Sequence, residues 1–227
     1  MDNTVLYIAN ASFLENVSLF DKAYKLVSNQ RQKKVDKFKF GKDKRLSLAS
    51  ELLLMFALKE QNISVNNLVF DYKENNKPYL PSLKNKIKFN ISHSGEFVIC
   101  AVSPDEVGCD IEKIKKYDLN VAKRFFNEKE FQNISLQATE AEKQDMFYRY
   151  WTLKESFVKA LGQGLHLSLK DFQIIIDGQE ISVEQKENSN SYYFKEYDID
   201  NYKCAVCSCG KDFAQEIIKV DLEQFIN

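Results

Sequence analysis

The feature that most constrains the fold is a likeness between the two halves of the chain. When the 227-residue sequence is shifted by 104 residues, identical residues coincide over about 60 positions without a gap. The coincident residues are Arg45 and Arg149, Glu51 and Glu155, Ser64 and Ser168, and the runs Cys100-Ala101-Val102 and Cys204-Ala205-Val206. The shift predicts two similar halves that arose by gene duplication. A chance likeness of two amphipathic patterns is the alternative. Duplicated halves usually bury a shared face, so a ligand site is expected between them.

Hydrophobic periodicity predicts helices first and strands after in each half. The predicted helices cover one or two segments of 17–40, then 45–58, 121–134 and 143–161. The predicted strands cover 87–91, 97–103, 107–112, 172–176, 191–198 and 202–208. This order indicates a mixed α+β fold, with halves at residues 1–106 and 107–227. The segment Gly162-Gln163-Gly164 is expected to end a helix.

Composition excludes several classes of protein. The 32 Lys and Arg residues balance 33 Asp and Glu residues at a net charge of -1, so no global basic field exists to wrap nucleic acid. No apolar run reaches the length of about 18 residues that a membrane span needs, and the first residues do not read as a signal peptide. A cytoplasmic protein is therefore expected.

The five cysteines point to the same compartment. An odd count leaves at least one thiol unpaired, which suits a reducing environment. The spacing of Cys204 and Cys207 also invites a zinc or redox reading. Residues three apart on a strand point to opposite faces, however, so buried free thiols are expected.

The segment Gly108-Cys109-Asp110-Ile111-Glu112 carries the first candidate site. On a strand, Asp110 and Glu112 share one face while Cys109 and Ile111 point into the core. Two adjacent carboxylates repel each other unless a cation lies between them, and Mg²⁺ is a natural partner. A solvated strand edge is the alternative.

The expected helix 143–161 carries the second candidate. Glu155 and Lys159 are four residues apart and share a helix face. An exposed ion pair is the alternative. The surrounding sequence is apolar and aromatic, so these charges should be partly buried and need partners. A third carboxylate ligand and a phosphate-binding lysine would have such partners.

Two further groups could bind anions. In Phe89-Asn90-Ile91-Ser92-His93-Ser94-Gly95, a turn after a strand offers hydroxyls and an imidazole. A nucleophilic Ser-His pair is disfavoured there, because adjacent residues cannot easily form the required hydrogen bond. His166 is expected to be structural. The basic candidates are Arg31, Lys33, Lys34, Arg45 and Lys77, for each of which a solvated surface position is the alternative. No phosphate-binding loop or dinucleotide fingerprint occurs.

Taken together, the segments FNISHSG, VGCDIE and WTLKESFVKALGQGL resemble those of the 4′-phosphopantetheinyl transferases, in particular the surfactin-synthetase-activating type. The segments NKPYLP, AKRFF and YKCAVCS also look like family segments. The resemblance covers nearly the whole chain. It implies a pseudo-dimer of two α+β halves, in agreement with the shift of 104 residues.

The resemblance implies an enzyme that moves 4′-phosphopantetheine from coenzyme A to a serine of an apo carrier protein. Asp110, Glu112 and Glu155 would hold Mg²⁺. Lys159 and Lys77 would contact phosphates near the reaction centre. Glu155 is the first choice as general base and Glu112 the second. The residues implied around the adenosine 3′-phosphate are Ser92, His93 and Arg45, with Arg31 or Lys34.

The expected partner is an acidic, helical carrier, peptidyl or polyketide rather than fatty-acid, which would dock on residues 113–126. A solvated helix with a core stripe is the alternative for that segment. The duplication implies a monomer. Two rival functions are a non-catalytic module that binds coenzyme A or the carrier, and a nucleic-acid-binding protein that uses residues 31–44. The first should have lost a metal ligand, and all three are present.

Overall fold

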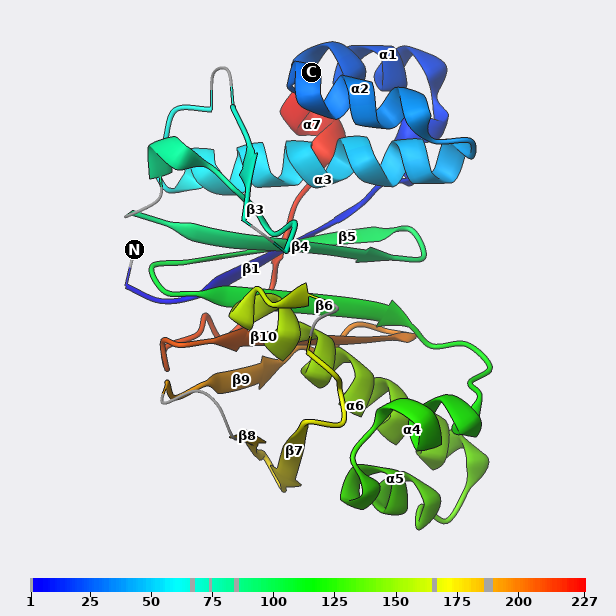
Figure 1. Cartoon of the computed structure of the whole chain (residues 1–227). Coiled ribbons are helices and arrows are strands. Elements are labelled where there is room, and N and C mark those ends of the chain that lie inside the picture. Colours follow the sequence, from blue (N-terminus) through cyan, green and yellow to red (C-terminus); the bar gives the residue numbers. More distant parts are fainter. Residues whose placement is uncertain (1, 66–67, 74, 84–85, 165–166, 186–189) are drawn as a thin grey trace.

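The structure is a computed structural model that describes residues 2–65, 68–73, 75–83, 86–164, 167–185 and 190–227. It consists of four layers, in which helices cover the outer faces of two sheets that pack against each other (Figure 1). A helical layer with the long helix α3 (Gly41–Glu60) covers one sheet, and the long helix α6 (Glu140–Leu161) covers the other. The predicted α+β fold class is confirmed.

The first half supplies the upper sheet and its helices. Its strands are β1 (Val5–Asn10), β2 (Asp71–Tyr72), β3 (Pro78–Tyr79), β4 (Lys88–Ser94) and β5 (Phe97–Ser103). Its other helices are α1 (Val17–Leu26), α2 (Asn29–Lys37) and the 3-10 helices η1 (Ser12–Glu15) and η2 (Pro81–Leu83). The polar stretch 17–40 thus forms two helices. Ser28 separates them, because its hydroxyl caps α2 by accepting a hydrogen bond from the backbone N–H of Arg31 at 3.2 Å.

The second half repeats this plan. Its strands are β6 (Val107–Lys113), β7 (Phe172–Asp177), β8 (Glu180–Gln185), β9 (Tyr193–Glu196) and β10 (Tyr202–Ser208), and its other helices are α4 (Leu119–Phe125) and α5 (Glu128–Ser135). The sheets have the orders β1-β5-β4 and β6-β10-β9.

The strand register confirms the two similar halves. Leu6 of β1 pairs with Ala101 of β5, and Asp110 of β6 pairs with Ala205 of β10, so both partners are shifted by the same 104 residues. The faces of the strands do not follow this shift, however, because Leu6 and Ile8 face the other sheet together with Cys109 and Ile111, whereas Asp110 and Glu112 lie on the opposite face of β6. The carboxylates of the candidate site belong to one half only.

Three apolar clusters fill the spaces between the layers. One lies between α3 and its sheet and a second between α6 and the other sheet. The third joins the facing sides of the two sheets, where Leu6 and Ile99 pack with Cys109 and Val206. Cys109 and Ile111 are both fully buried, as the alternation along β6 predicts.

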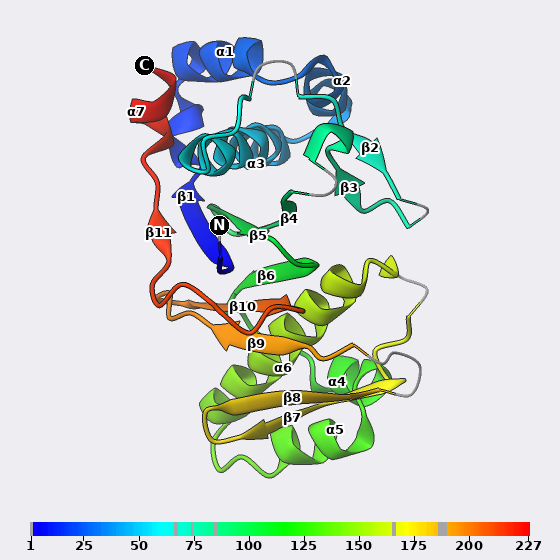
Figure 2. The ribbon, with the colours of Figure 1, turned by 90° about the vertical axis from the view of Figure 1, so that its left-hand side faces the viewer.

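The C-terminal segment returns to the first half (Figure 2). Strand β11 (Ile218–Lys219) pairs in parallel with the outer edge of β1, and α7 (Leu222–Ile226) packs on α1 and α3. The division into residues 1–106 and 107–227 stays a prediction. Residues 218–226 belong to the second half in sequence but pack against the first half in space.

The predicted helix 121–134 is wrong in one respect, since two short helices, α4 and α5, occupy the region. Asn127 interrupts it, because its side chain caps α5 and Glu130 closes a capping box on the Asn127 backbone at 2.9 Å. Gly162 ends α6 in a left-handed conformation with φ of 72°, as predicted.

All five cysteines are free thiols, four of them buried. None of the helices within the described ranges has the length and apolarity that crossing a membrane requires. His166 lies outside the described residues.

Candidate functional site

The site forms where the two halves meet, along the neighbouring strands β4 and β6. Side chains of β4 hydrogen-bond to β6 in place of a backbone ladder: Asn90 Oδ1 accepts from the N–H of Cys109 at 2.9 Å. Two residues on, the hydroxyl of Ser92 donates to Asp110 Oδ1 at 2.8 Å, and that of Ser94 donates to Glu112 Oε2 at 2.8 Å. Strand alternation thus sets hydroxyls of one half against carboxylates of the other.

Helix α6 adds a cation to this pair of strands. Lys159 Nζ donates to Asp110 Oδ1 at 2.6 Å, to Ser92 Oγ at 3.0 Å and to the carbonyl of Cys109 at 3.2 Å. Burial, the largest single effect, disfavours the ammonium, but the charge and hydrogen bond of Asp110 together with smaller contributions from neighbouring groups outweigh it, so the pKa of Lys159 is raised. The structure therefore brings together Ser92, Asp110 and Lys159, which come from three separate sequence motifs.

Gly108 makes this approach possible. A Cβ at this position would lie 2.1 Å from the carbonyl oxygen of Ser156 and 2.3 Å from the backbone nitrogen of Ala160. The backbone of α6 thus packs directly on β6, and only glycine fits between them. The sequence displays this glycine next to Asp110, but nothing local to it indicates the contact with α6.

The carboxylates affect one another. Burial and then the charge of Asp110 raise the pKa values of Glu112 and Glu155. Glu155 has no hydrogen bond or ion pair to any described residue. Within the described ranges, no three acidic, thiol or imidazole groups are gathered closely enough to form a ready metal site. Asp110 Oδ2, however, is buried without a hydrogen-bond partner, and such an oxygen is the kind of donor that Mg²⁺ binds.

His93 lies beside this cluster. The surrounding protein and then the positive charge of Lys159 lower its pKa, with a smaller contribution from Lys34. Asp43 of α3 opposes the effect of these two cations.

Two of the other predicted cations of the first half, Arg31 and Arg45, have partners. Arg31 donates from Nε to Glu51 Oε2 at 3.0 Å and from a terminal nitrogen to Ser47 Oγ at 3.1 Å. Arg45 pairs with Glu15 at 3.0 Å, while its Nε is buried without a partner. Lys34 has no such bond among the described residues, and burial followed by the charge of Arg31 lowers its pKa. Lys34, like the neighbouring exposed Lys33, is thus not held by a partner among the described residues.

Glu51 shows how the two halves have diverged. It is the counterpart of Glu155 in the first half, but it is buried and accepts hydrogen bonds from the backbone of Ser28 at 2.6 Å and from Arg31. The position of Lys159 is taken by Met55. In the first half, Glu51 therefore holds the start of α2 in place. In the second half, the carboxylate of Glu155 has no hydrogen-bond partner among the described residues and can take part in chemistry.

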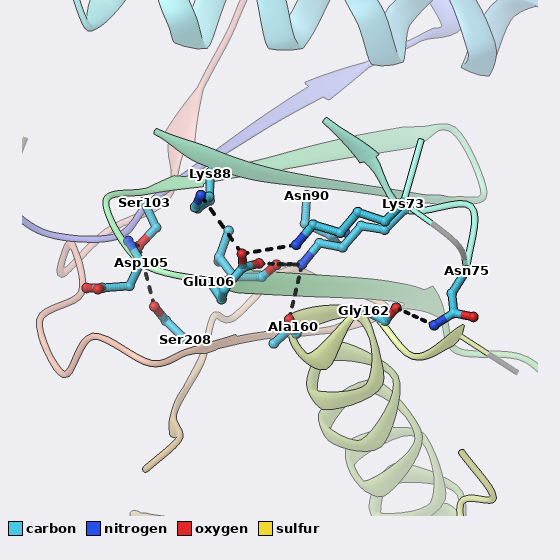
Figure 3. A network of polar contacts seen from close by, with 12 residues as sticks. Lys73, Asn75, Lys88, Asn90, Ser103, Asp105, Glu106, Ala160, Gly162 and Ser208 are labelled. Carbon is cyan, nitrogen blue, oxygen red and sulfur yellow. Dashed lines mark hydrogen bonds and ion pairs between the residues drawn. The ribbon is translucent and has the colours of Figure 1, made fainter. Parts of the chain in front are cut away.

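Lys77 contacts the C-terminal end of α6. Its Nζ donates to Glu106 Oε2 at 3.2 Å and to the carbonyls of Val107 and Ala160, both at 3.1 Å. Figure 3 labels two of these acceptor residues, Glu106 and Ala160. The ammonium is therefore engaged by protein oxygens and not by the cluster around Lys159. The lysine was singled out by the sequence, but these contacts were not foreseen.

A cavity of about 620 Å³ opens beside Glu155 and Lys159. Trp151 and Val158 of α6 and Phe125 of α4 form its apolar walls, with residues 75–78 of the first half opposite. A cavity between the halves was predicted from the repeat. It can hold an elongated ligand with an anionic end near Lys159 and an apolar part near Trp151.

Comparisons with known proteins define the family. Residues 16–105 match the family model described as 4′-phosphopantetheinyl transferase, N-terminal, and residues 106–207 match that of the 4′-phosphopantetheinyl transferase superfamily. The chain is 36% identical over 204 residues to the 4′-phosphopantetheinyl transferase Sfp of Bacillus subtilis (strain 168), covering 88% of this chain and 90% of that protein. It is 32% identical over 205 residues to the 4′-phosphopantetheinyl transferase gsp of Aneurinibacillus migulanus, covering 88% and 84%.

A crystal structure of the Thermotoga maritima holo-[acyl-carrier-protein] synthase is also similar, with a TM-score of 0.41, 21% identity and coverage of 47% of this chain and 63% of that one. On the sequence relationships, the chain belongs to the 4′-phosphopantetheinyl transferase superfamily and is a transferase of the Sfp type. The family expected from the sequence motifs is confirmed.

Proposed function

We propose that this chain transfers the 4′-phosphopantetheine group of coenzyme A to a serine hydroxyl of an apo carrier protein, with Mg²⁺, and releases adenosine 3′,5′-bisphosphate. The observation that carries the proposal is the contact of Lys159 with Asp110 and Ser92 at the junction of the halves. It joins an acidic strand face, a hydroxyl and a cation, the groups that phosphoryl transfer requires.

The metal would be held by Asp110, Glu112 and Glu155. The unpartnered Oδ2 of Asp110 supports this assignment, as does the mutual repulsion of the three carboxylates that a cation would relieve. Mg²⁺ would supply charge neutralisation on the pyrophosphate of coenzyme A.

The phosphates of coenzyme A would be bound by the cations and hydroxyls of the two halves. Lys159 lies beside Asp110 and suits the pyrophosphate. Ser92, which the resemblance assigns to the adenosine 3′-phosphate, hydrogen-bonds to both Asp110 and Lys159 and is therefore proposed to serve the pyrophosphate instead. His93 and Lys34, supported by Arg45, suit the adenosine 3′-phosphate. Lys34 is preferred to Arg31, because Arg31 is already bound to Glu51 and Ser47.

The serine proton would be taken by Glu155. Its carboxylate lines the cavity and has no hydrogen-bond partner among the described residues, whereas Glu112 accepts from Ser94. A general base must be free to accept the proton, which favours Glu155 and leaves Glu112 second.

The carrier would dock on residues 113–126, beside the cavity. The exposed side chains of this segment are Lys115, Lys116, Asp118, Asn120, Lys123, Arg124 and Phe125, so four of the seven are basic and one is acidic. Phe125 is 41% exposed, and the guanidinium of Arg124 lies 5.2 Å from its ring centre. Basic groups around an exposed aromatic ring suit an acidic carrier with an apolar spot.

A peptidyl or polyketide carrier, as in nonribosomal peptide and antibiotic synthesis, is preferred to a fatty-acid carrier, because the sequence motifs resemble those of the surfactin-synthetase-activating type. Because one chain supplies both sides of the site, a monomer suffices. The five free thiols favour the cytoplasm.

The test is the intact mass of two apo carriers, one peptidyl and one fatty-acid, after incubation with the protein, coenzyme A and Mg²⁺. A gain of about 340 Da, the mass of one phosphopantetheine, is expected on the peptidyl carrier, and its absence with EDTA would show the need for metal. Glu155→Gln should abolish the gain, while Glu128→Gln, an exposed glutamate of α5, should not. Binding of coenzyme A without any mass gain would favour the non-catalytic module.

A further inference from the structure

The C-terminal end of α6 is capped by the other half of the molecule. The last turn of a helix leaves carbonyl groups without intrahelical partners. Two of these carbonyls accept hydrogen bonds from side chains of the first half (Figure 3). Lys77 Nζ donates to Ala160 O at 3.1 Å, and Asn75 Nδ2 donates to Gly162 O at 3.1 Å. A cation at this end of a helix also opposes the helix dipole.

The ammonium of Lys77 is fully used in this role. It has three protons, and Ala160, Val107 and Glu106 provide three acceptors within 3.2 Å. The side chain is only 9% exposed. A phosphate could bind Lys77 only by displacing one of these oxygens.

The contacts of Lys77 join the elements that carry the site. Val107 begins β6, which carries Asp110 three residues later, and Ala160 directly follows Lys159. One ammonium thus fixes the end of α6 to the start of β6. The stem of the lysine also lies over Gly162, where a Cβ would be 3.2 Å from Lys77 Cδ.

We infer that Lys77 is a positioning residue for the transfer reaction, which caps the C-terminal end of α6 from the opposite half and so holds Lys159 on Asp110. The kinetic consequence of this inference rests on the proposed function, whereas the cap itself rests on the structure alone. Loss of the cap would let the last turn of α6 fray and would displace Lys159. A displacement of about 1 Å at a reacting centre can lower the rate about 100-fold.

The matched control is Lys73. It pairs with the same carboxylate, Glu106 Oε1 at 3.1 Å, but it is 46% exposed and has no hydrogen bond to α6. Lys77→Met and Lys73→Met remove the same charge from the same carboxylate, and only the first removes the cap. Any difference between them therefore reports on the contacts that only Lys77 makes, with Ala160 of α6 and Val107 of β6.

The first measurement is hydrogen exchange of the peptide that covers the end of α6. Faster exchange is expected in Lys77→Met and unchanged exchange in Lys73→Met. This readout needs no transfer activity, so it tests the cap even if the proposed reaction fails. If Lys77→Met does not fold, Asn75→Ala removes the other capping bond and should accelerate exchange at the same peptide.

The second measurement is a double-variant cycle on the transfer rate. Lys77→Met is expected to lower kcat about tenfold or more, and to add little further loss when Lys159→Met is already present. Affinity for adenosine 3′,5′-bisphosphate, followed by the fluorescence of Trp151, should change less than about threefold. Additive losses with weakened nucleotide binding would make Lys77 a phosphate ligand. Unchanged exchange in both Lys77→Met and Asn75→Ala would refute the cap.

Discussion

Replacement of Lys154 is expected to weaken the fold without removing a reacting group. Although this lysine belongs to the motif W-x-x-K-E, its side chain and that of Glu130 are both 0% exposed and form an ion pair at 2.6 Å. Lys154 Nζ also donates to the carbonyl of Phe172 and lies 4.1 Å from the centre of its ring. The pair joins α6, α5 and β7 in the core. Burial lowers the pKa of Lys154 to about 8, even though Glu130 opposes this change.

The size of the effect follows from the charge that is left behind. Lys154→Met keeps an unbranched apolar side chain but leaves the Glu130 carboxylate with only the backbone N–H groups of Ile174 and Asn127, at 2.7 and 2.9 Å. The carboxylate can become neutral by taking up a proton, which at pH 7 costs about 3.7 kcal/mol for a glutamate of ordinary acidity. Breaking a buried ion pair costs about 3–5 kcal/mol in general, so a loss of about 3–4 kcal/mol is expected.

Urea unfolding at two pH values measures this loss, with Trp151, the single tryptophan, as the probe. A carboxyl that is protonated in the folded variant gives stability that is present at low pH and lost as pH rises. The deficit relative to the unsubstituted protein should therefore shrink to about 1 kcal/mol at pH 5. The double variant Lys154→Met with Glu130→Gln should recover most of it, because a neutral amide can still accept from Ile174. The transfer rate per folded molecule should not change.

Three results would refute this reasoning. A deficit below about 1 kcal/mol at pH 7 would mean that the lysine does not stabilise the buried carboxylate. Equal deficits at pH 5 and pH 7 would mean that no proton is taken up. Additive effects of the two substitutions would mean that the pair is not coupled.

Three further predictions concern the site. Gly108→Ala places a Cβ against the backbone of α6, so kcat should fall about 100-fold or more and the melting temperature should also fall. The neighbouring substitution Cys109→Val should leave the transfer rate unchanged. Asp110→Asn removes the charge that holds Lys159 and also removes a metal donor. The Mg²⁺ concentration that gives half of the maximal rate should therefore rise at least about tenfold. An unchanged Mg²⁺ titration would contradict the assignment of Asp110 as a metal ligand. Lys34→Gln should raise the KM for coenzyme A about tenfold. The KM for dephospho-coenzyme A, which lacks the 3′-phosphate, should not change. The control Arg31→Gln should instead lower stability, because Arg31 is bound to Glu51.

The sequence was most informative where a pattern is local. The buried helix expected at 45–58 is the centre of α3, and the alternation along β6 places Asp110 and Glu112 on one face. The repeat predicted the two halves because both share one order of helices and strands; the shift of 104 residues holds for the pairing of β1 with β5 and of β6 with β10, but not for that of β4 with β5 and of β9 with β10. Family motifs then identified the class of enzyme, as the relatives confirm.

Other features depend on contacts between distant residues and were missed. The two-residue strand β11 exists only because β1 offers it an edge, and β1 itself was not predicted. The roles of Lys77 and Lys154 are set by Glu106 and Glu130, which no spacing rule links to them. The helix break at Asn127 was visible as a capping box, but the apolar stripe on both sides concealed it.

The return of the chain terminus to the first half affects how the protein is made. Strand β11 and helix α7 follow the end of the first half by about 120 residues. At about 5–20 residues per second, a ribosome needs about 6–24 s to synthesise them. During that time the outer edge of β1 and part of the α3 surface lack their final cover, and an open strand edge is prone to pair with other chains. The first half is thus translated first but completed last, and its outer strand edge stays open to other chains until the final residues have been added.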